Sequence, residues 1–233
     1  MPTILLLLML LASHANADQP LRVAVAANFR ATLQEATDQF QQETGIPVML
    51  SSGSTGVLYS QIMHGAPFDL FFAADRESAE KLAAGGGAAG EPFCYARGRL
   101  VLAGGDGALA QLGNPDLSLA IANPVTAPYG VAALAVLARP EFATGESRKL
   151  VRGTNVVQAY QFWQSGAVDL ALLPRALAPR ATLIADSWHP ALEQFAVALT
   201  PAADKPALAS YLNWIRSDRV LTLISDAGYE PCP

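Results

Sequence analysis

Four short loops hold the residues of this chain that are best suited to bind a small ion. The loops span residues 27–29, 53–56, 127–130 and 154–156. Their polar residues include Asn28, Thr55, Tyr129 and Asn155, and none of the loops contains a charged side chain. Because each loop leads into a predicted helix, it presents backbone N–H groups that no helical carbonyl accepts, at the positive end of a helix dipole. The sequence therefore predicts an anion site built from dipoles and hydroxyls rather than from cations.

The chemistry of such a site restricts the kind of anion that it suits. A doubly charged oxyanion is costly to desolvate unless hydrogen bonds replace its water shell, and a charged acceptor strengthens each of these bonds. A fully deprotonated oxyanion only accepts hydrogen bonds, so a ring of donors matches it. Hydrogen phosphate also donates, and would need an acceptor carboxylate that the four loops lack. The pattern thus argues against phosphate, whereas residue types alone do not give the size of the anion.

The segments that must position these loops alternate between strands and helices. Apolar runs predict strands at residues 21–26, 47–50, 69–74, 99–103, 117–121, 168–173 and 195–199. Helical periodicity predicts helices at residues 29–44, 57–63, 75–84, 130–138, 156–164, 202–216 and 218–226. This alternation is typical of parallel α/β sheets, in which ligands bind beyond the carboxyl ends of the strands. Loops of this kind are often polar without binding anything, and Asn28 stands where it could cap the first helix.

The first residues of the chain predict export. An apolar run from Ile4 to Ala12 precedes Ala15-Asn16-Ala17, which has the small-x-small form of a signal-peptidase site. We therefore expect residues 1–17 to be a signal peptide, cleaved after Ala17, and the protein to be periplasmic. A membrane anchor is the alternative, but the apolar run is too short to span a bilayer. The remaining 216 residues (233 minus 17) can fill one large or two small domains.

Charge and motif content exclude several classes of function. Acidic residues number 20 against 15 basic ones, a net charge of −5, so we expect no nucleic-acid partner, which would require a clustered basic patch. The three histidines lie in no Ser/His/Asp or Cys/His arrangement, and no CxxC or HxxxH spacing indicates zinc. We expect a protein that is not an enzyme and has neither a cofactor nor a metal site of its own.

The chain has two cysteines, Cys94 and Cys232. In an oxidising compartment, a disulfide between them is the natural expectation, and it would join the C-terminal tail to the middle of the chain. Two separate thiols are the alternative, because a sequence does not show whether the two residues come within bonding distance.

Several segments resemble a known family. Gly65–Asp75, GAPFDLFFAAD, resembles the GAPaDlFisAD segment of the periplasmic molybdate-binding proteins that feed ABC transporters. Further similar segments are Val23–Phe29, Ile121–Pro124, Ala127–Gly130 and Gly153–Ala159. The likeness covers nearly the whole mature chain in the same order. It implies an α/β, two-lobed periplasmic binding protein fold of type II, in which each lobe is a mostly parallel sheet flanked by helices. One lobe would comprise residues 20–96 plus about 200–233, and the other residues 97–199.

The resemblance also implies which residues contact the anion. These are Asn28, Thr55, Tyr129 and Val156, the last through its backbone N–H, with Asn155 adjacent to it. The chain departs from the family at three positions. Pro174 stands where some members have a tyrosine, Thr154 replaces a common glutamate, and Thr55 adds a methyl group where serine is usual.

The function that the resemblance implies is capture of molybdate or tungstate outside the cytoplasm and delivery to the membrane permease of an ABC transporter. We expect the protein to act as a monomer. Sulfate or another small oxyanion in the same transport role is the alternative, because the three departures bear on which anion fits.

Overall fold

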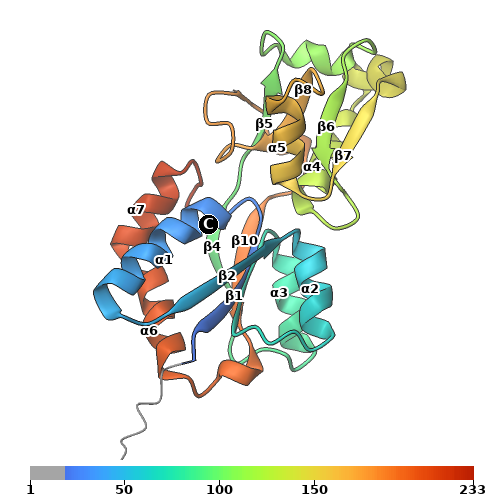
Figure 1. The fold of residues 1–233 in the computed structure, drawn as a ribbon. Helices are drawn as coiled ribbons and strands as arrows, with labels where there is room; N and C mark the ends of the chain where they lie inside the picture. The colour runs from blue at the N-terminus through green and yellow to red at the C-terminus, as the bar shows by residue number, and fades with distance from the viewer. Residues whose placement is uncertain (1–18) are drawn as a thin grey trace, which may run out of the picture.

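Two five-stranded sheets form the centres of two lobes in the computed structural model, which describes residues 19–233 (Figure 1). The first sheet has the strand order β2-β1-β3-β10-β4. Its strands are β1 (Leu21–Ala26), β2 (Val48–Gly53), β3 (Leu70–Ala73), β4 (Phe93–Arg97) and β10 (Glu193–Ala198). The helices of this lobe are α1 (Arg30–Thr44), α2 (Thr55–Met63), α3 (Arg76–Ala84), α6 (Pro206–Ile215) and α7 (Asp218–Asp226).

The second sheet has the strand order β7-β6-β8-β5-β9. Its strands are β5 (Leu100–Gly104), β6 (Leu119–Ala122), β7 (Leu150–Gly153), β8 (Leu170–Pro174) and β9 (Thr182–Leu183). Two helices flank it, α4 (Pro128–Leu137) and α5 (Val156–Gln164). Short 3-10 turns connect the elements: η1 (Leu109–Gly113), η2 (Pro140–Ser147), η3 (Asp186–Trp188) and η4 (Thr200–Ala202). The α/β class, the alternation of elements and the two-lobed architecture agree with the sequence-based expectation.

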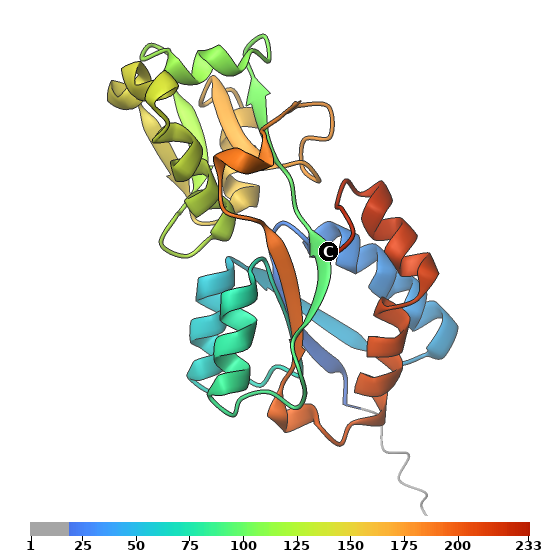
Figure 2. The same cartoon turned by 180° about the vertical axis from the view of Figure 1, so that it is seen from behind.

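In each sheet one strand runs against the other four, and in both cases it is the strand that the chain enters on crossing between lobes. β10 pairs antiparallel with β3 and β4, and β5 pairs antiparallel with β8 and β9. The parallel strands of each sheet end at the face toward the other lobe. A chain that crosses over therefore enters the next sheet at that face and must run away from it. Figure 2 shows the two crossing segments side by side at the centre of the molecule.

The return crossing lies earlier in the chain than the sequence indicated. Residues 97–199 were assigned to the second lobe, but β10 is hydrogen-bonded within the first sheet, so residues 193–199 lie with the first lobe. The capping role considered for Asn28 is also wrong, because α1 begins at Arg30 and its N-cap is Phe29. Asn28 is thereby left in the loop itself, directly before the N-cap residue Phe29.

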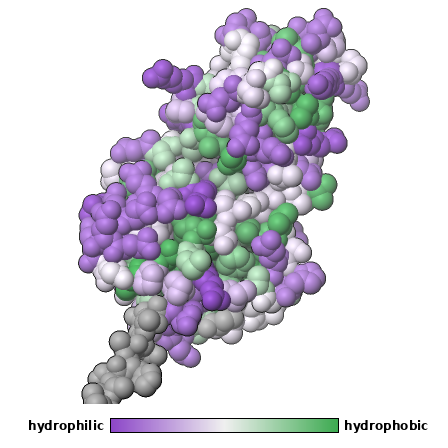
Figure 3. All heavy atoms as spheres, in the orientation of Figure 1, coloured by the Kyte–Doolittle hydropathy of each residue, from purple (hydrophilic) through white to green (hydrophobic). Residues whose placement is uncertain are grey.

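Both faces of each sheet are covered by helices. In the first lobe α1, α6 and α7 pack on one face and α2 and α3 on the other, and Figure 1 shows the two groups on opposite sides of the sheet. The face of α1 predicted to be apolar is buried, with Leu33, Ala36 and Phe40 each at most 1% exposed. Hydrophilic residues cover the outer side of this helix (Figure 3). In the second lobe α4 and α5 cover opposite faces of the sheet.

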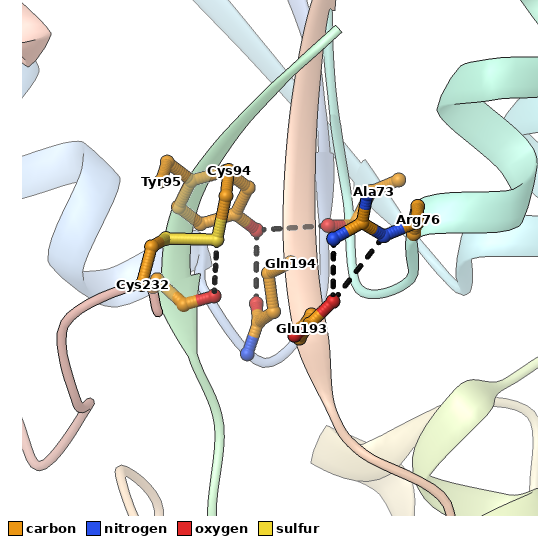
Figure 4. Close-up of a disulfide and its surroundings, with 8 residues drawn as sticks. Ala73, Arg76, Cys94, Tyr95, Glu193, Gln194 and Cys232 are labelled. Atoms are coloured by element: carbon orange, nitrogen blue, oxygen red, sulfur yellow. Dashed lines mark hydrogen bonds and ion pairs between the residues drawn. A yellow bond between two sulfur atoms is a disulfide. The ribbon is translucent and has the colours of Figure 1, made fainter.

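The C-terminal tail is attached to β4 at the start of the outgoing crossing. A disulfide joins Cys94 to Cys232, with the two Cα atoms 6.0 Å apart (Figure 4). Glu230 pairs with Arg97 through two backbone hydrogen bonds of 2.8 Å, so the tail extends the sheet beyond its edge strand. The carboxylate of Glu230 also forms an ion pair with Arg99, which in turn contacts Asp186 of the second lobe. Covalent, backbone and ionic contacts thus hold the tail beside the hinge.

The expected signal peptide, residues 1–17, lies outside the described residues. Within residues 19–233, none of the helices has the length and apolar character that crossing a membrane requires.

Candidate functional site

A small cavity lies between the lobes, at the carboxyl ends of strands from both sheets. It is lined by Ala26, Ala27, Asn28, Ser54, Thr55, Ala74, Ala127, Pro128, Tyr129, Asn155 and Val156. These residues follow β1, β2, β3, β6 and β7. Its volume, taken as the space open to the centre of a water molecule, is only about 10 Å³. All five predicted site residues are among the eleven lining residues, none of which is charged.

The lobes touch at this cavity, which shows that the structure is a closed form. The N–H of Gly56, in the first turn of α2, donates to the carbonyl of Thr126 in the second lobe at 2.9 Å. Ala27 of the first lobe belongs to the same buried apolar cluster as Ala127 and Val156 of the second. A ligand in the cavity would therefore be covered from both sides, and the lobes must part for it to enter.

Two neighbouring hydroxyls at the start of α2 are available to a ligand for different reasons. Ser54 is the N-cap of α2, but its side chain makes no capping hydrogen bond, although serine at this position usually does. Its Oγ is buried and has no partner within the described residues. The Thr55 Oγ1 accepts a hydrogen bond from the N–H of Ala74 at 3.0 Å, which leaves the hydroxyl hydrogen free to donate. Buried polar groups normally have partners, so this pair indicates a missing acceptor.

Backbone donors surround the same space. The N–H groups of Asn28, Thr55, Tyr129 and Val156 make no hydrogen bond within the described part of the chain. Three of them belong to the first turns of α2, α4 and α5, where no preceding carbonyl can accept. Donors from both lobes therefore meet at a point where the dipoles of three helices present their positive ends.

The side chain of Asn28 does not serve the cavity directly. Its Nδ2 donates to Gln194 Oε1 at 2.7 Å and to the hydroxyl of Tyr229 at 3.3 Å. The same Tyr229 hydroxyl donates to the carbonyl oxygen of Asn28 at 2.7 Å. With both amide hydrogens engaged elsewhere, the group that Asn28 can offer an anion is its backbone N–H. The resemblance implies that Asn28 contacts the anion, and these hydrogen bonds leave its backbone N–H, not its amide side chain, for that contact.

Tyr129 and Asn155 are likewise held by contacts outside the cavity. The Tyr129 hydroxyl accepts from Gln194 Nε2 at 3.3 Å, and burial raises the pKa of this phenol well above its usual range, so it stays neutral. The side-chain oxygen of Asn155 accepts from the N–H groups of Val157 and Gln158 at 2.9 and 3.1 Å, which caps α5. The cap leaves the Val156 N–H unpaired. Pro174, at the end of β8, is not among the cavity residues.

Sequence reasoning missed two polar residues of this region. Ser54 was not among the predicted contact residues, although its place directly before a helix, after Gly53, was a usable signal. Gln194 had no sequence signal, since it follows Glu193 directly before the predicted strand at residues 195–199 and its hydrogen-bond partners are distant in sequence. Among the described residues no group of three or more His, Cys, Asp or Glu side chains could hold a metal ion.

The fold and the cavity together define a two-lobed binding protein whose lobes close over a small ligand. The chain belongs to the bacterial extracellular solute-binding proteins, whose family model matches residues 21–230.

Individual relatives agree with this assignment. The chain is 38% identical to the molybdate-binding protein ModA of Azotobacter vinelandii, over 94% of this chain and 93% of the relative. It is 33% identical to ModA of Rhodobacter capsulatus, over 97% and 94% of the two chains. The solved structure of the A. vinelandii periplasmic molybdate-binding protein superposes with a TM-score of 0.83 at 34% identity, covering 91% of this chain and 100% of that one. The resemblance read from the sequence is confirmed, and these relatives are binding proteins rather than enzymes.

Proposed function

We propose that this protein captures molybdate, or tungstate, in the cavity between its lobes and delivers it to the membrane permease of an ABC transporter. The observation that carries the proposal is the lining itself: unpaired N–H groups from both lobes, two hydroxyls at the start of α2, and no charged residue. A tetrahedral oxyanion without protons accepts hydrogen bonds from all sides, which matches this arrangement. The names of the curated relatives support molybdate as the cargo. The protein acts as an exported monomer, with its signal peptide cleaved after Ala17.

The test is a calorimetric titration of the mature protein with molybdate, tungstate, sulfate and phosphate at a single pH. We expect molybdate and tungstate to bind tightly and phosphate not to bind, since the cavity lining offers no carboxylate to accept a hydrogen bond from hydrogen phosphate. Tight binding of sulfate with weak molybdate binding would keep the class of protein and replace the cargo. Absence of binding with all four anions would contradict the proposal.

The hydroxyl of Ser54 allows a clean test of where the anion sits. Because Ser54 Oγ has no partner in the protein, Ser54→Ala removes an unsatisfied buried group, so the free energy of unfolding should stay the same or rise. A hydrogen bond to a charged group is worth about 1.5–3 kcal/mol, so the dissociation constant for molybdate should increase roughly 10- to 150-fold. Titration calorimetry and thermal unfolding measure the two quantities on the same sample.

Thr55 provides the matched comparison. Thr55→Ala should lower both affinity and stability, because it also leaves the Ala74 N–H without an acceptor, whereas Thr55→Ser should keep both close to the original values. If Ser54→Ala and Thr55→Ala both bind molybdate with unchanged affinity, neither hydroxyl at the start of α2 contacts the anion.

A further inference from the structure

A fully buried glutamine outside the cavity connects the two halves of the site. Gln194 is 0% exposed and lies on β10. Its Oε1 accepts hydrogen bonds from Asn28 Nδ2 at 2.7 Å and from the Tyr95 hydroxyl at 2.9 Å. Its Nε2 donates to the Tyr129 hydroxyl at 3.3 Å. With Tyr229, which bonds to Asn28, these residues form what we call the Gln194 network: Asn28, Tyr95, Tyr129, Gln194 and Tyr229.

The hydrogen-bond partners of Gln194 lie in both lobes and on the strand from which the chain crosses to the second lobe. Asn28 is in a site loop of the first lobe, Tyr129 lies in the first turn of α4 in the second lobe, and Tyr95 lies on the outgoing strand β4. Figure 4 shows the side chains of Tyr95 and Gln194 meeting between β4 and β10. Gln194 itself is not among the cavity residues. A single amide thus joins both lobes at the hinge without touching the ligand space.

Local features of the two crossing segments make room for this amide. The register between β10 and β4 shifts between Gln194 and Phe195, which changes how the strand presents its side chains. Gly98, directly after β4, has no Cβ, and an added one would lie 1.9 Å from the Tyr129 hydroxyl oxygen and 2.7 Å from Gln194 Nε2. Only glycine at this position allows Tyr129 to reach Gln194.

The network consists of neutral groups. Burial raises the pKa values of Tyr95, Tyr129 and Tyr229, so all three phenols keep their protons at ordinary pH. Low local dielectric makes such hydrogen bonds strong and makes a missing partner costly, so a satisfied network fixes the positions of its members. The network can therefore couple the positions of residues in the two lobes, but it carries no charge between them.

We propose that Gln194 is a positioning residue that holds the Asn28 loop in its binding geometry and couples it to closure of the second lobe through Tyr129. The inference rests on the proposed function, because it takes the N–H groups of Asn28 and Tyr129 as anion donors. The bond to Asn28 joins two parts of the first lobe and persists when the lobes part. The bond to Tyr129 exists only when the second lobe lies over the first, so closure and loop geometry stabilise each other.

A double-mutant cycle tests the coupling. Gln194→Met keeps a similar side-chain length and removes both the amide oxygen and the amide nitrogen, and Tyr129→Phe removes the hydroxyl but keeps the backbone N–H. In molybdate titrations we expect about a 30-fold loss of affinity for Gln194→Met and about a 5-fold loss for Tyr129→Phe, with the double variant no weaker than Gln194→Met. If the two losses multiply in the double variant, the residues act independently and the proposal is overturned.

Hydrogen exchange of the ligand-free protein tests the hold on the Asn28 loop without any anion. The N–H groups of Ala27 and Phe29 donate to the carbonyls of Gly53 and Ala26. In Gln194→Met, these two amides should exchange about 10-fold faster relative to the amides of β6. In Tyr129→Phe, their exchange rates should remain unchanged. Equal acceleration throughout the first lobe would indicate only a structural role, and no acceleration would overturn the proposal.

These two experiments separate failure of the inference from failure of the proposed function. If the wild-type protein binds none of the oxyanions, the function is wrong, yet the exchange rates still decide whether Gln194 holds the loop. If Gln194→Met does not fold, Gly98→Ala takes its place, since its Cβ displaces the Tyr129 hydroxyl from Gln194. If Gly98→Ala loses affinity and the double variant Gly98→Ala/Tyr129→Phe binds no more weakly than the weaker single variant, the coupling is supported. If the two losses multiply in the double variant, the coupling is contradicted.

Discussion

Replacing Val156 by proline should reduce the affinity for molybdate by a factor of roughly 10 to 150, the equivalent of about 1.5–3 kcal/mol for one hydrogen bond to a charged group. Val156 is the first residue of α5, where its N–H makes no hydrogen bond within the described chain. Proline is well tolerated at this helix position because its missing N–H is not used there. Asn155 has φ −153° and ψ −179°, the extended conformation that a residue before proline prefers. The substitution thus removes one donor and leaves the helix in place.

Two controls isolate the loss of this N–H. Val156→Ala loses the same buried side chain but keeps the N–H, so its affinity should stay close to that of the wild type. Asp218→Pro places proline at the corresponding position of α7, far from the cavity, and should leave both affinity and helix content unchanged. Circular dichroism and titration calorimetry measure the two properties. Equal affinities for Val156→Pro and Val156→Ala would show that this N–H does not contact the anion.

Loss of the disulfide should produce the largest change in stability. The bond between Cys94 and Cys232 spans 138 residues of sequence. For a closed loop of this length, the restriction of the unfolded chain is worth about 3–5 kcal/mol, so the double variant Cys94→Ser/Cys232→Ser should melt about 10 °C lower or more. Scanning calorimetry of the wild type with and without reductant gives the same comparison without mutation.

The tail itself should stay in place after the bond is lost, because Glu230 keeps its backbone pairing with Arg97 and its ion pair with Arg99. We therefore expect the double serine variant to bind molybdate within a fewfold of the wild-type affinity below its melting temperature. A melting temperature that does not respond to reductant would contradict the stabilising role. A large loss of affinity at unchanged stability would instead assign the bond to the site.

Much of this fold could be predicted because the decisive signals are local. The boundaries of α5 and α7 agree with the sequence to the residue, since Asn155 caps one helix and Ser217 directly precedes the other. Short strands without alternation gave weaker signals. β4 has the sequence FCYAR, which contains no run of branched aliphatic residues, and its place at the sheet edge depends on pairing with β10, almost 100 residues later. The residues of a strand do not show which distant strand it pairs with, which is also why β10 was assigned to the wrong lobe.

The same division applies to the site. Helix starts with small polar residues can be recognised in a sequence, and they located all four loops. Which atom of each residue faces the cavity depends on contacts from elsewhere: Gln194 and Tyr229 turn the Asn28 amide away, and Ala74 occupies one side of the Thr55 hydroxyl. Loop chemistry could be predicted, whereas the roles of individual groups required the packing of residues far apart in the chain.

The neutral lining of the cavity also bears on how the anion leaves. A pocket built around arginine or lysine would keep a buried cation after its anion departed, and a competing anion would have to replace it. Here the eleven lining residues carry no charge, and when the lobes part a few water molecules can satisfy the exposed N–H and O–H groups. If the protein carries molybdate as proposed, emptying the pocket requires no counter-ion exchange, and the oxyanion leaves without a companion charge.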